Sequence, residues 1–169
     1  GEGYYCKTGY EKYGSECKAK INQTEAYELA EQAYENKDYQ TAFREFTVLA
    51  KNGNEKAQNY LGVIYEVGNG VTKDYKLAVS WYRKAANQGN STAQNNLGVM
   101  YENGDGVIKD FKQAFSWYMK SANQGNDFGQ WNLGSLYKDG KGVAQNDNLA
   151  LSWYRKAANQ GHSEAKKDL

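Results

Sequence analysis

The sequence predicts an all-α fold, built as a stack of similar helical hairpins. Residues 57–92 and 93–128 are identical at 24 of 36 positions when aligned without gaps, and residues 129–164 match 93–128 at 17 positions. Within each block, apolar residues recur at spacings of three and four, which is the period of a helix face. Glycines follow these runs, where helices are expected to end. A repeat of this length predicts supersecondary units that pack on one another.

The composition is that of a folded protein with little net charge. The 169 residues are 40% hydrophobic and 14% aromatic, and 21 Lys and Arg against 20 Asp and Glu give a formal net charge of +1. This balance argues against a nucleic-acid or anionic-membrane binder that relies on bulk charge. No apolar stretch approaches the roughly 20 residues that cross a bilayer. One His, two Cys and no Pro exclude most metal sites and histidine-based triads.

Two motifs define the first helix of each repeat. Leu-Gly-x-x-Tyr starts at Leu61 and recurs 36 and 72 residues later, and its spacing of four places leucine and tyrosine on one helix face. Gly-x-Gly-Val starts at Gly68 and recurs at the same intervals. Its glycines permit the positive φ of a helix end and a tight turn. We therefore expect the first helix to end at this glycine.

A second helix is predicted after the turn. Asp74, Asp110 and Asn146 are residue types that cap the free N–H groups at a helix start. Ala, Trp, Tyr and Ala or Ser then follow at helical spacings, and Asn-Gln-Gly ends the helix. The aromatic residues expected to face the core are Trp81, Tyr82, Trp117, Tyr118, Trp153 and Tyr154. One hairpin buries too little apolar surface to fold alone, so neighbouring hairpins must stack.

The ends of the chain are predicted to cap the three full repeats. Residues 21–56 contain a degenerate second helix and form a shorter, more polar hairpin, as a terminal unit does. Residues 165–169 begin a further first helix, whereas residues 1–20 do not follow the pattern.

Segment 1–20 holds both cysteines. A bridge between Cys6 and Cys17 closes a short loop and contributes roughly 3 kcal/mol in the chain-entropy picture. It implies an oxidising compartment such as the periplasm or the cell exterior. The alternative is two unrelated thiols in a cytosolic protein. Because the chain starts with Gly1, we expect that a signal peptide has been removed.

The order Ala-x-x-x-Leu-Gly-x-x-Tyr, Gly-x-Gly-Val, Asp, Ala-x-x-Trp-Tyr, Ala-Ala and Gly resembles the Sel-one-like repeat, a relative of the tetratricopeptide repeat. The resemblance covers residues 57–164 fully and 22–56 weakly, and the third repeat departs from it at Gly129, where the others have alanine. It implies a right-handed α-solenoid whose first helices line a concave surface. Proteins of this kind usually act as adaptors or scaffolds in protein complexes, and many bacterial members are exported.

By the same resemblance, the concave surface carries the variable side chains of the first helices. A ladder of asparagines there suits the backbone of an extended peptide, because each amide both donates and accepts hydrogen bonds. Phe128 and Trp131 break the repeat pattern with large apolar groups, either as anchors for a partner or as packing against the last hairpin. The predicted partner-binding residues are Asn59, Tyr60, Val63, Glu66, Asn95, Asn96, Val99, Glu102, Phe128, Trp131, Asn132 and Lys138.

Three features that sometimes carry chemistry have plainer interpretations. The repetition of Gly-x-Gly indicates turn geometry rather than a phosphate-binding loop. His162 takes the place of Asn90 and Asn126 at a helix start, which favours a solvated or capping role. Glu66 and Glu102 are interpreted as solvated charges of the groove, since nothing in the sequence raises the pKa of either carboxyl.

These features predict a monomeric, non-enzymatic adaptor, scaffold or inhibitor that binds a protein or an extended peptide on its concave surface. Two alternatives stay open. One is a hydrolase acting on cell-wall or antibiotic substrates, for which the sequence offers no nucleophile. The other is a structural spacer that binds through its convex face or its N-terminal segment. We expect no nucleic-acid partner, no metal, no cofactor and no insertion into a membrane.

Overall fold

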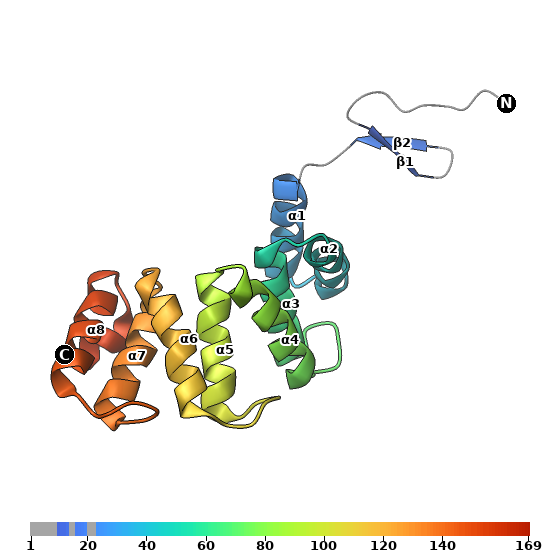
Figure 1. Ribbon diagram of the computed structural model, residues 1–169. Helices are drawn as coiled ribbons and strands as arrows, with labels where there is room; N and C mark the ends of the chain where they lie inside the picture. Colours follow the sequence, from blue (N-terminus) through green and yellow to red (C-terminus); the bar gives the residue numbers. More distant parts are fainter. Residues whose placement is uncertain (1–9, 14–15, 20–22) are drawn as a thin grey trace.

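The chain forms a row of helical hairpins preceded by a short two-stranded ribbon (Figure 1). The structure is a computed structural model and describes residues 10–13, 16–19 and 23–169. The helices within these ranges are α1 (Gln23–Glu35), α2 (Tyr39–Lys51), α3 (Glu55–Val67), α4 (Tyr75–Asn87), α5 (Ser91–Asn103), α6 (Phe111–Asn123), α7 (Asp127–Asp139), α8 (Asp147–Asn159) and α9 (Ser163–Lys167).

The helical part confirms the predicted all-α solenoid. Helices α1 to α8 have 13 residues each, and they pair as α1/α2, α3/α4, α5/α6 and α7/α8. Each helix contacts the next along the chain, and α5 also contacts α7 (Figure 1). None of the helices in the described ranges combines the length and apolar character needed to cross a membrane.

The ribbon lies in the segment that does not follow the repeat. Strand β1 (Tyr10–Tyr13) pairs antiparallel with β2 (Glu16–Ala19), with Tyr10 opposite Ala19. These strands were not predicted from the sequence. The sequence there has no helical period, and its tyrosines favour extended backbone. The predicted bridge to Cys17 in β2 involves Cys6, which lies outside the described residues, so the bridge stays a prediction.

The helix ends follow the predicted residues. Gly68 has a φ of 87° and ends α3 in the left-handed region, as expected for a helix C-terminus. At the start of α4, Oδ1 of Asp74 accepts a hydrogen bond from the backbone N–H of Leu77 at 3.0 Å. Asp110 and Asn146 cap α6 and α8 in the same way.

In each full repeat, the two helices pack through a contact between a glycine of the first helix and a tyrosine of the second helix. Tyr82, Tyr118 and Tyr154 are buried, at 0 to 2% exposure. A Cβ atom at Gly62 would lie 2.4 Å from Cδ1 of Tyr82, and one at Gly98 would lie 2.5 Å from Cε1 of Tyr118. Carbon atoms do not approach so closely, so the glycine is what lets the two helices pack at this distance.

The tryptophans connect each hairpin to the one before it. Trp81 of α4 packs against the apolar cluster of α1, α2 and α3, Trp117 against that of α4 and α5, and Trp153 against that of α6 and α7. Their outer faces are covered by lysines, with Nζ of Lys84 lying 4.1 Å from the centre of the Trp81 ring. The predicted core role is confirmed for the tyrosines, whereas the tryptophans are half-buried links between hairpins.

A ladder of glutamines also joins consecutive hairpins. Nε2 of Gln88 donates to Oε1 of Gln58 at 2.7 Å, and Nε2 of Gln58 donates to the carbonyl of Ala50 at 3.1 Å. The same pair of bonds recurs 36 and 72 residues later. Because Gln58, Gln94 and Gln130 are buried, the bonds that they make offset the cost of removing their amides from water.

The departure at Gly129 has a packing reason. A Cβ atom there would lie 2.4 Å from Oγ of Ser121. Ser121 is fully buried and donates to the carbonyl of Ser91 at 2.7 Å. One repeat earlier, Ala85 and Ala93 occupy the same two places. A larger residue in α6 is therefore matched by a smaller one in α7.

This pairing predicts a double-mutant cycle. Gly129→Ala should lower the free energy of unfolding by about 1–3 kcal/mol, because the added methyl group overpacks against Ser121. Ser121→Ala combined with Gly129→Ala should recover most of that loss, apart from about 1 kcal/mol for the lost hydrogen bond. Urea unfolding measures both values, with Ser116→Ala on the exposed face of α6 as the control. Losses that simply add would contradict the proposed contact.

Candidate functional site

A groove runs over the first helices of the N-terminal half of the stack. It has a volume of about 510 Å³ and is bordered by α1, α3 and α5. Four of the predicted binding residues lie together in its wall. The lining residues are Tyr27, Glu31, Lys56, Asn59, Tyr60, Val63, Asn90, Thr92 and Asn96.

The groove includes two residues that sequence reasoning missed, Tyr27 and Glu31 of α1. The hydroxyl of Tyr60 donates to Oε1 of Glu31 at 2.8 Å, and the hydroxyl of Tyr27 donates to the same oxygen at 3.3 Å. Helix α1 starts at Gln23 and α3 at Glu55, so these helices align only with a shift of 32 residues. A comparison at that shift would have placed Tyr27 and Glu31 at groove positions.

Tyr60 is held firmly in the groove wall. Its ring stacks on that of Phe46, with the ring centres 4.5 Å apart and the planes 12° from parallel. Burial raises the pKa of Tyr60 to about 12, and the hydrogen bond to Glu31 and the charges of Glu31 and Glu35 act in the same direction. Burial also raises the pKa of Tyr27 above its usual value. Both phenols are therefore neutral donors at ordinary pH.

The predicted asparagines form pairs across neighbouring first helices. Nδ2 of Asn96 donates to Oδ1 of Asn59 at 3.2 Å, between α5 and α3. Nδ2 of Asn132 donates to Oδ1 of Asn95 at 2.8 Å, between α7 and α5. Asn95 is buried, whereas the other three are half-buried. The pairing holds each amide in place and uses one of its two polar atoms.

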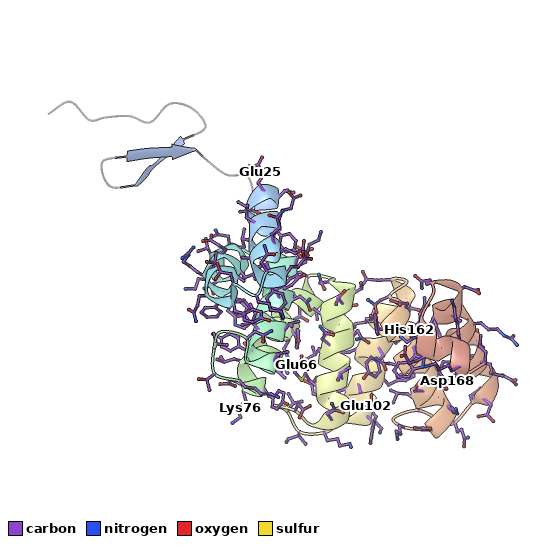
Figure 2. All side chains as sticks on the ribbon, turned by 180° about the vertical axis from the view of Figure 1, so that it is seen from behind. Glu25, Glu66, Lys76, Glu102, His162 and Asp168 are labelled. Carbon is purple, nitrogen blue, oxygen red and sulfur yellow. The ribbon has the colours of Figure 1, made fainter. Side chains whose placement is uncertain are left out.

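The C-terminal end of this ladder is closed by α9. The indole N–H of Trp131 donates to Asp168 at 2.8 Å, and the ring stacks on that of His162 with the centres 5.3 Å apart. Figure 2 labels His162 and Asp168 at this end of the stack. Nδ1 of His162 accepts the backbone N–H of Ala165 at 3.2 Å. This bond confirms the predicted capping role of His162. The side chain is buried rather than solvated. Phe128 touches the same imidazole but is 56% exposed.

Glu66 and Glu102 are half-buried rather than freely solvated. The hydroxyl of Tyr82 donates to Glu66 at 2.5 Å, and that of Tyr118 donates to Glu102 at 2.7 Å. Both glutamates are labelled in Figure 2. Burial raises the pKa of Tyr118 well above its usual range, and the charge of Glu102 and the hydrogen bond to it reinforce the shift. This pairing could not be predicted from the sequence, because the tyrosine and the glutamate lie on different helices.

Val99 and Lys138, like the other predicted residues outside the set of four named above, do not line the groove. Val99 packs against the apolar cluster of α6 and α7. Lys138 is exposed and lines a second, smaller pocket of about 190 Å³ next to Tyr154 and Asp168. The predicted residues are thus distributed over the groove, the asparagine ladder and the C-terminal end. Across the described ranges, no group of three or more His, Cys, Asp or Glu side chains is placed to hold a metal ion.

The pairing of Tyr118 with Glu102 predicts a pH-dependent stability. Tyr118→Phe should lower the free energy of unfolding at pH 7 by about 1–3 kcal/mol, because the hydroxyl donates to a charged group. The pKa of Tyr118 is higher in the folded than in the unfolded protein. The stabilisation by its hydroxyl is therefore fully present below a pH of about 10 and is lost as the pH rises further. Urea unfolding of the variant should therefore show a smaller fall in stability above that pH than the wild type does.

The matched control is Tyr137→Phe. Its ring packs edge-on against Phe115, with the centres 5.5 Å apart, and no described residue bonds to its hydroxyl. An equal alkaline loss of stability in Tyr118→Phe and in the wild type would contradict the pairing.

Comparison with known proteins places these features in a family. The family model described as "Sel1 repeat" matches residues 4–42, 55–90, 91–126 and 128–162. The last three segments each span one full hairpin, and the first includes the ribbon, α1 and the start of α2. No protein with a curated description matches the chain.

Solved structures of similar proteins show the same architecture. A protective antigen of uropathogenic Escherichia coli with an SLR fold is 38% identical, with a TM-score of 0.80 over 85% of this chain and 32% of the antigen. A Sel1 repeat protein from Oxalobacter formigenes is 37% identical, with a TM-score of 0.79 over 84% and 58%. Helicobacter pylori cysteine rich protein B is 27% identical, with a TM-score of 0.58 over 68% and 93%.

The chain spans about a third of the length of the first of these proteins and somewhat more than half of the second. Sel1-repeat folds are commonly protein-interaction modules and are generally non-catalytic. The predicted resemblance is confirmed by the matched segments, the helical hairpins and the structural neighbours. The chain belongs to the Sel1 repeat family.

Proposed function

We propose that this chain is a non-enzymatic protein-interaction module that binds a protein or an extended peptide in the groove of α1, α3 and α5. The observation that carries the proposal is the bond between Asn59 and Asn96. It uses Oδ1 of Asn59 and Nδ2 of Asn96, which leaves an amide donor on Asn59 and an amide acceptor on Asn96. A peptide backbone presents both kinds of group, so the pair can hold an extended segment without demanding a sequence.

The rigidity of the groove wall supports this function. Tyr60 is fixed by its stacking on Phe46 and by its hydrogen bond to Glu31, and Asn59 and Asn96 fix one another. Side chains that are already ordered lose little conformational entropy when a ligand binds. The proposed adaptor, scaffold or inhibitor is monomeric and presents a preformed groove to its partner.

The environment of the carboxylates supports a role without catalysis. Glu66 and Glu102 each accept a hydrogen bond from a buried tyrosine of their own repeat. Each carboxylate is thus engaged by the scaffold. A general acid or base, in contrast, must present its carboxyl group to the substrate.

The proposal predicts that a groove variant loses its partner. Asn59→Ala combined with Asn96→Ala removes both ends of one hydrogen bond, so the fold should lose little stability. A protein recovered by affinity capture from the envelope fraction of the encoding organism should bind this variant at least about tenfold more weakly in calorimetry, which is about 1.4 kcal/mol.

Two further proteins complete that experiment. Gln113→Ala, on the exposed side of α6, should bind like the wild type. Deletion of residues 1–20 should also leave the affinity unchanged. The opposite result is a partner that binds the asparagine variant as tightly as the wild type and fails to bind the protein without residues 1–20. That result would show that the N-terminal segment, and not the groove, makes the interaction.

We also propose that the chain is exported and that Cys6 and Cys17 form a disulfide in the periplasm or outside the cell. The proposal is supported by two cysteines eleven residues apart in one short segment, a pattern typical of stapled segments in oxidising compartments.

The disulfide predicts the reactivity of the thiols. Protein purified from an oxidising compartment and denatured without reductant should take up no iodoacetamide, because both sulfurs are bonded. After reduction, it should take up one equivalent at each of Cys6 and Cys17, as intact mass spectrometry measures. Cys17→Ser serves as the control and should react at Cys6 without reductant. Alkylation of both cysteines in the unreduced wild type would refute the bridge.

A further inference from the structure

Acidic and basic residues are divided between the two helices of each hairpin. The first helices α1, α3, α5 and α7 contain nine acidic and two basic residues, a net charge of −7. The second helices α2, α4, α6 and α8 contain nine basic and two acidic residues, a net charge of +7. The formal net charge of +1 conceals this division.

Part of the basic side has a packing reason. Lys84, Lys120 and Lys156 place Nζ 4.1, 4.1 and 3.8 Å from the centres of the tryptophan rings three residues before them. A cation over an aromatic face is a favourable contact. This contact explains why lysines recur in the second helices, but it does not explain the excess of acidic residues in the first helices.

The acidic side reaches the groove at α1, which has four glutamates and no basic residue. Glu31 lines the groove, and both tyrosine hydroxyls bond to its Oε1. Among the described side chains, none donates to its second oxygen, Oε2. Glu35 lies one turn further along α1, close enough to act on Tyr60. The groove therefore combines the carboxylate of Glu31 with tyrosine rings, and both kinds of group attract a cation.

One basic residue lines the groove. Lys56 is exposed, and its Nζ lies 5.6 Å from the centre of the Tyr27 ring. The axes of packed helices lie about 8–10 Å apart, which is close to the Debye length of about 8 Å at physiological salt. A ligand in the groove therefore feels the charges of α1 and α3 together, and Lys56 opposes the attraction of Glu31 and Glu35 for a cation.

We propose that the groove receives a basic, extended segment of the partner protein, with a lysine or arginine side chain placed at Glu31. This inference rests on the proposed function of the groove and adds the charge of its ligand. A charged donor on the ligand would bond to Oε2 of Glu31, while the amides of Asn59 and Asn96 hold the backbone beside it.

Three peptides test the proposal against the full chain. Each is about nine residues long, which spans roughly 30 Å when extended, and alternates serine with lysine, glutamine or glutamate. Fluorescence anisotropy of the labelled peptides should give the tightest binding for the lysine peptide and none for the glutamate peptide. The affinity for the lysine peptide should fall when the ionic strength is raised from about 0.05 to about 0.3 M.

Opposite substitutions in the groove give the sharpest test. Glu31→Gln should weaken binding of the lysine peptide by about two- to fivefold, whereas Lys56→Gln should strengthen it by a similar factor. Glutamine in place of Glu31 still accepts the tyrosine hydroxyls, and circular dichroism should show an unchanged helical signal. The control Glu45→Gln removes an acidic charge from the second helix α2 and should leave the affinity unchanged.

Each other outcome overturns the inference. Equal binding of the lysine and glutamine peptides would show that the groove does not select ligands by charge. The proposed function of the groove is tested separately, by the binding of the captured partner to the asparagine variant. No binding of the lysine peptide at about 1 mM, or unchanged affinity in both Glu31→Gln and Lys56→Gln, would also refute the inference. Salt-sensitive dimers in light scattering that disappear in Glu31→Gln would indicate that the basic helices of a second copy occupy the groove.

Discussion

The close approach of a glycine in one helix to a tyrosine ring in the next sets the geometry of each full repeat. At Gly62 and Gly98, a single added carbon would collide with the ring of Tyr82 or Tyr118. The buried ring then extends its hydroxyl to a glutamate of the first helix in the first two repeats. In the third repeat Tyr154 meets a serine hydroxyl at 3.2 Å instead. In the first two repeats, the buried tyrosine therefore sets the distance between the two helices and also holds the glutamate side chain in place.

The stack is held by contacts that each repeat makes with its neighbour. Trp81 and its equivalents pack on the preceding hairpin, and Gln58 and its equivalents donate to a carbonyl of that hairpin. The asparagines join first helix to first helix. In such a quasi-one-dimensional array, a surface feature belongs to the array and not to any one hairpin. The groove illustrates this property, because α1, α3 and α5 come from three different hairpins and all of them line it.

The chemistry of the groove comes from the hairpin that departs most from the repeat. Helix α1 contributes Tyr27 and Glu31 where the regular first helices have asparagine and valine, and it carries four of the nine acidic residues of the first helices. At the opposite end, Trp131 and Asp168 replace an asparagine pair and close the ladder against α9. The regular repeats thus supply a scaffold, and the irregular ends distinguish this chain from a plain array.

The sequence by itself determined the helical hairpins and their order, because the signals involved are local. The motif spacing, the glycine at Gly68 and the cap at Asp74 act within a few residues and need no tertiary context. Four of the predicted binding residues line the groove, because Asn59, Tyr60 and Val63 lie on α3 and Asn96 takes the place of Tyr60 one repeat later in α5. Only the tertiary structure decided that Glu31 meets Tyr60, that Glu66 is engaged by Tyr82 and that Trp131 packs against α9. Each of these contacts joins different helices, and the distance between their side chains depends on how closely those helices pack.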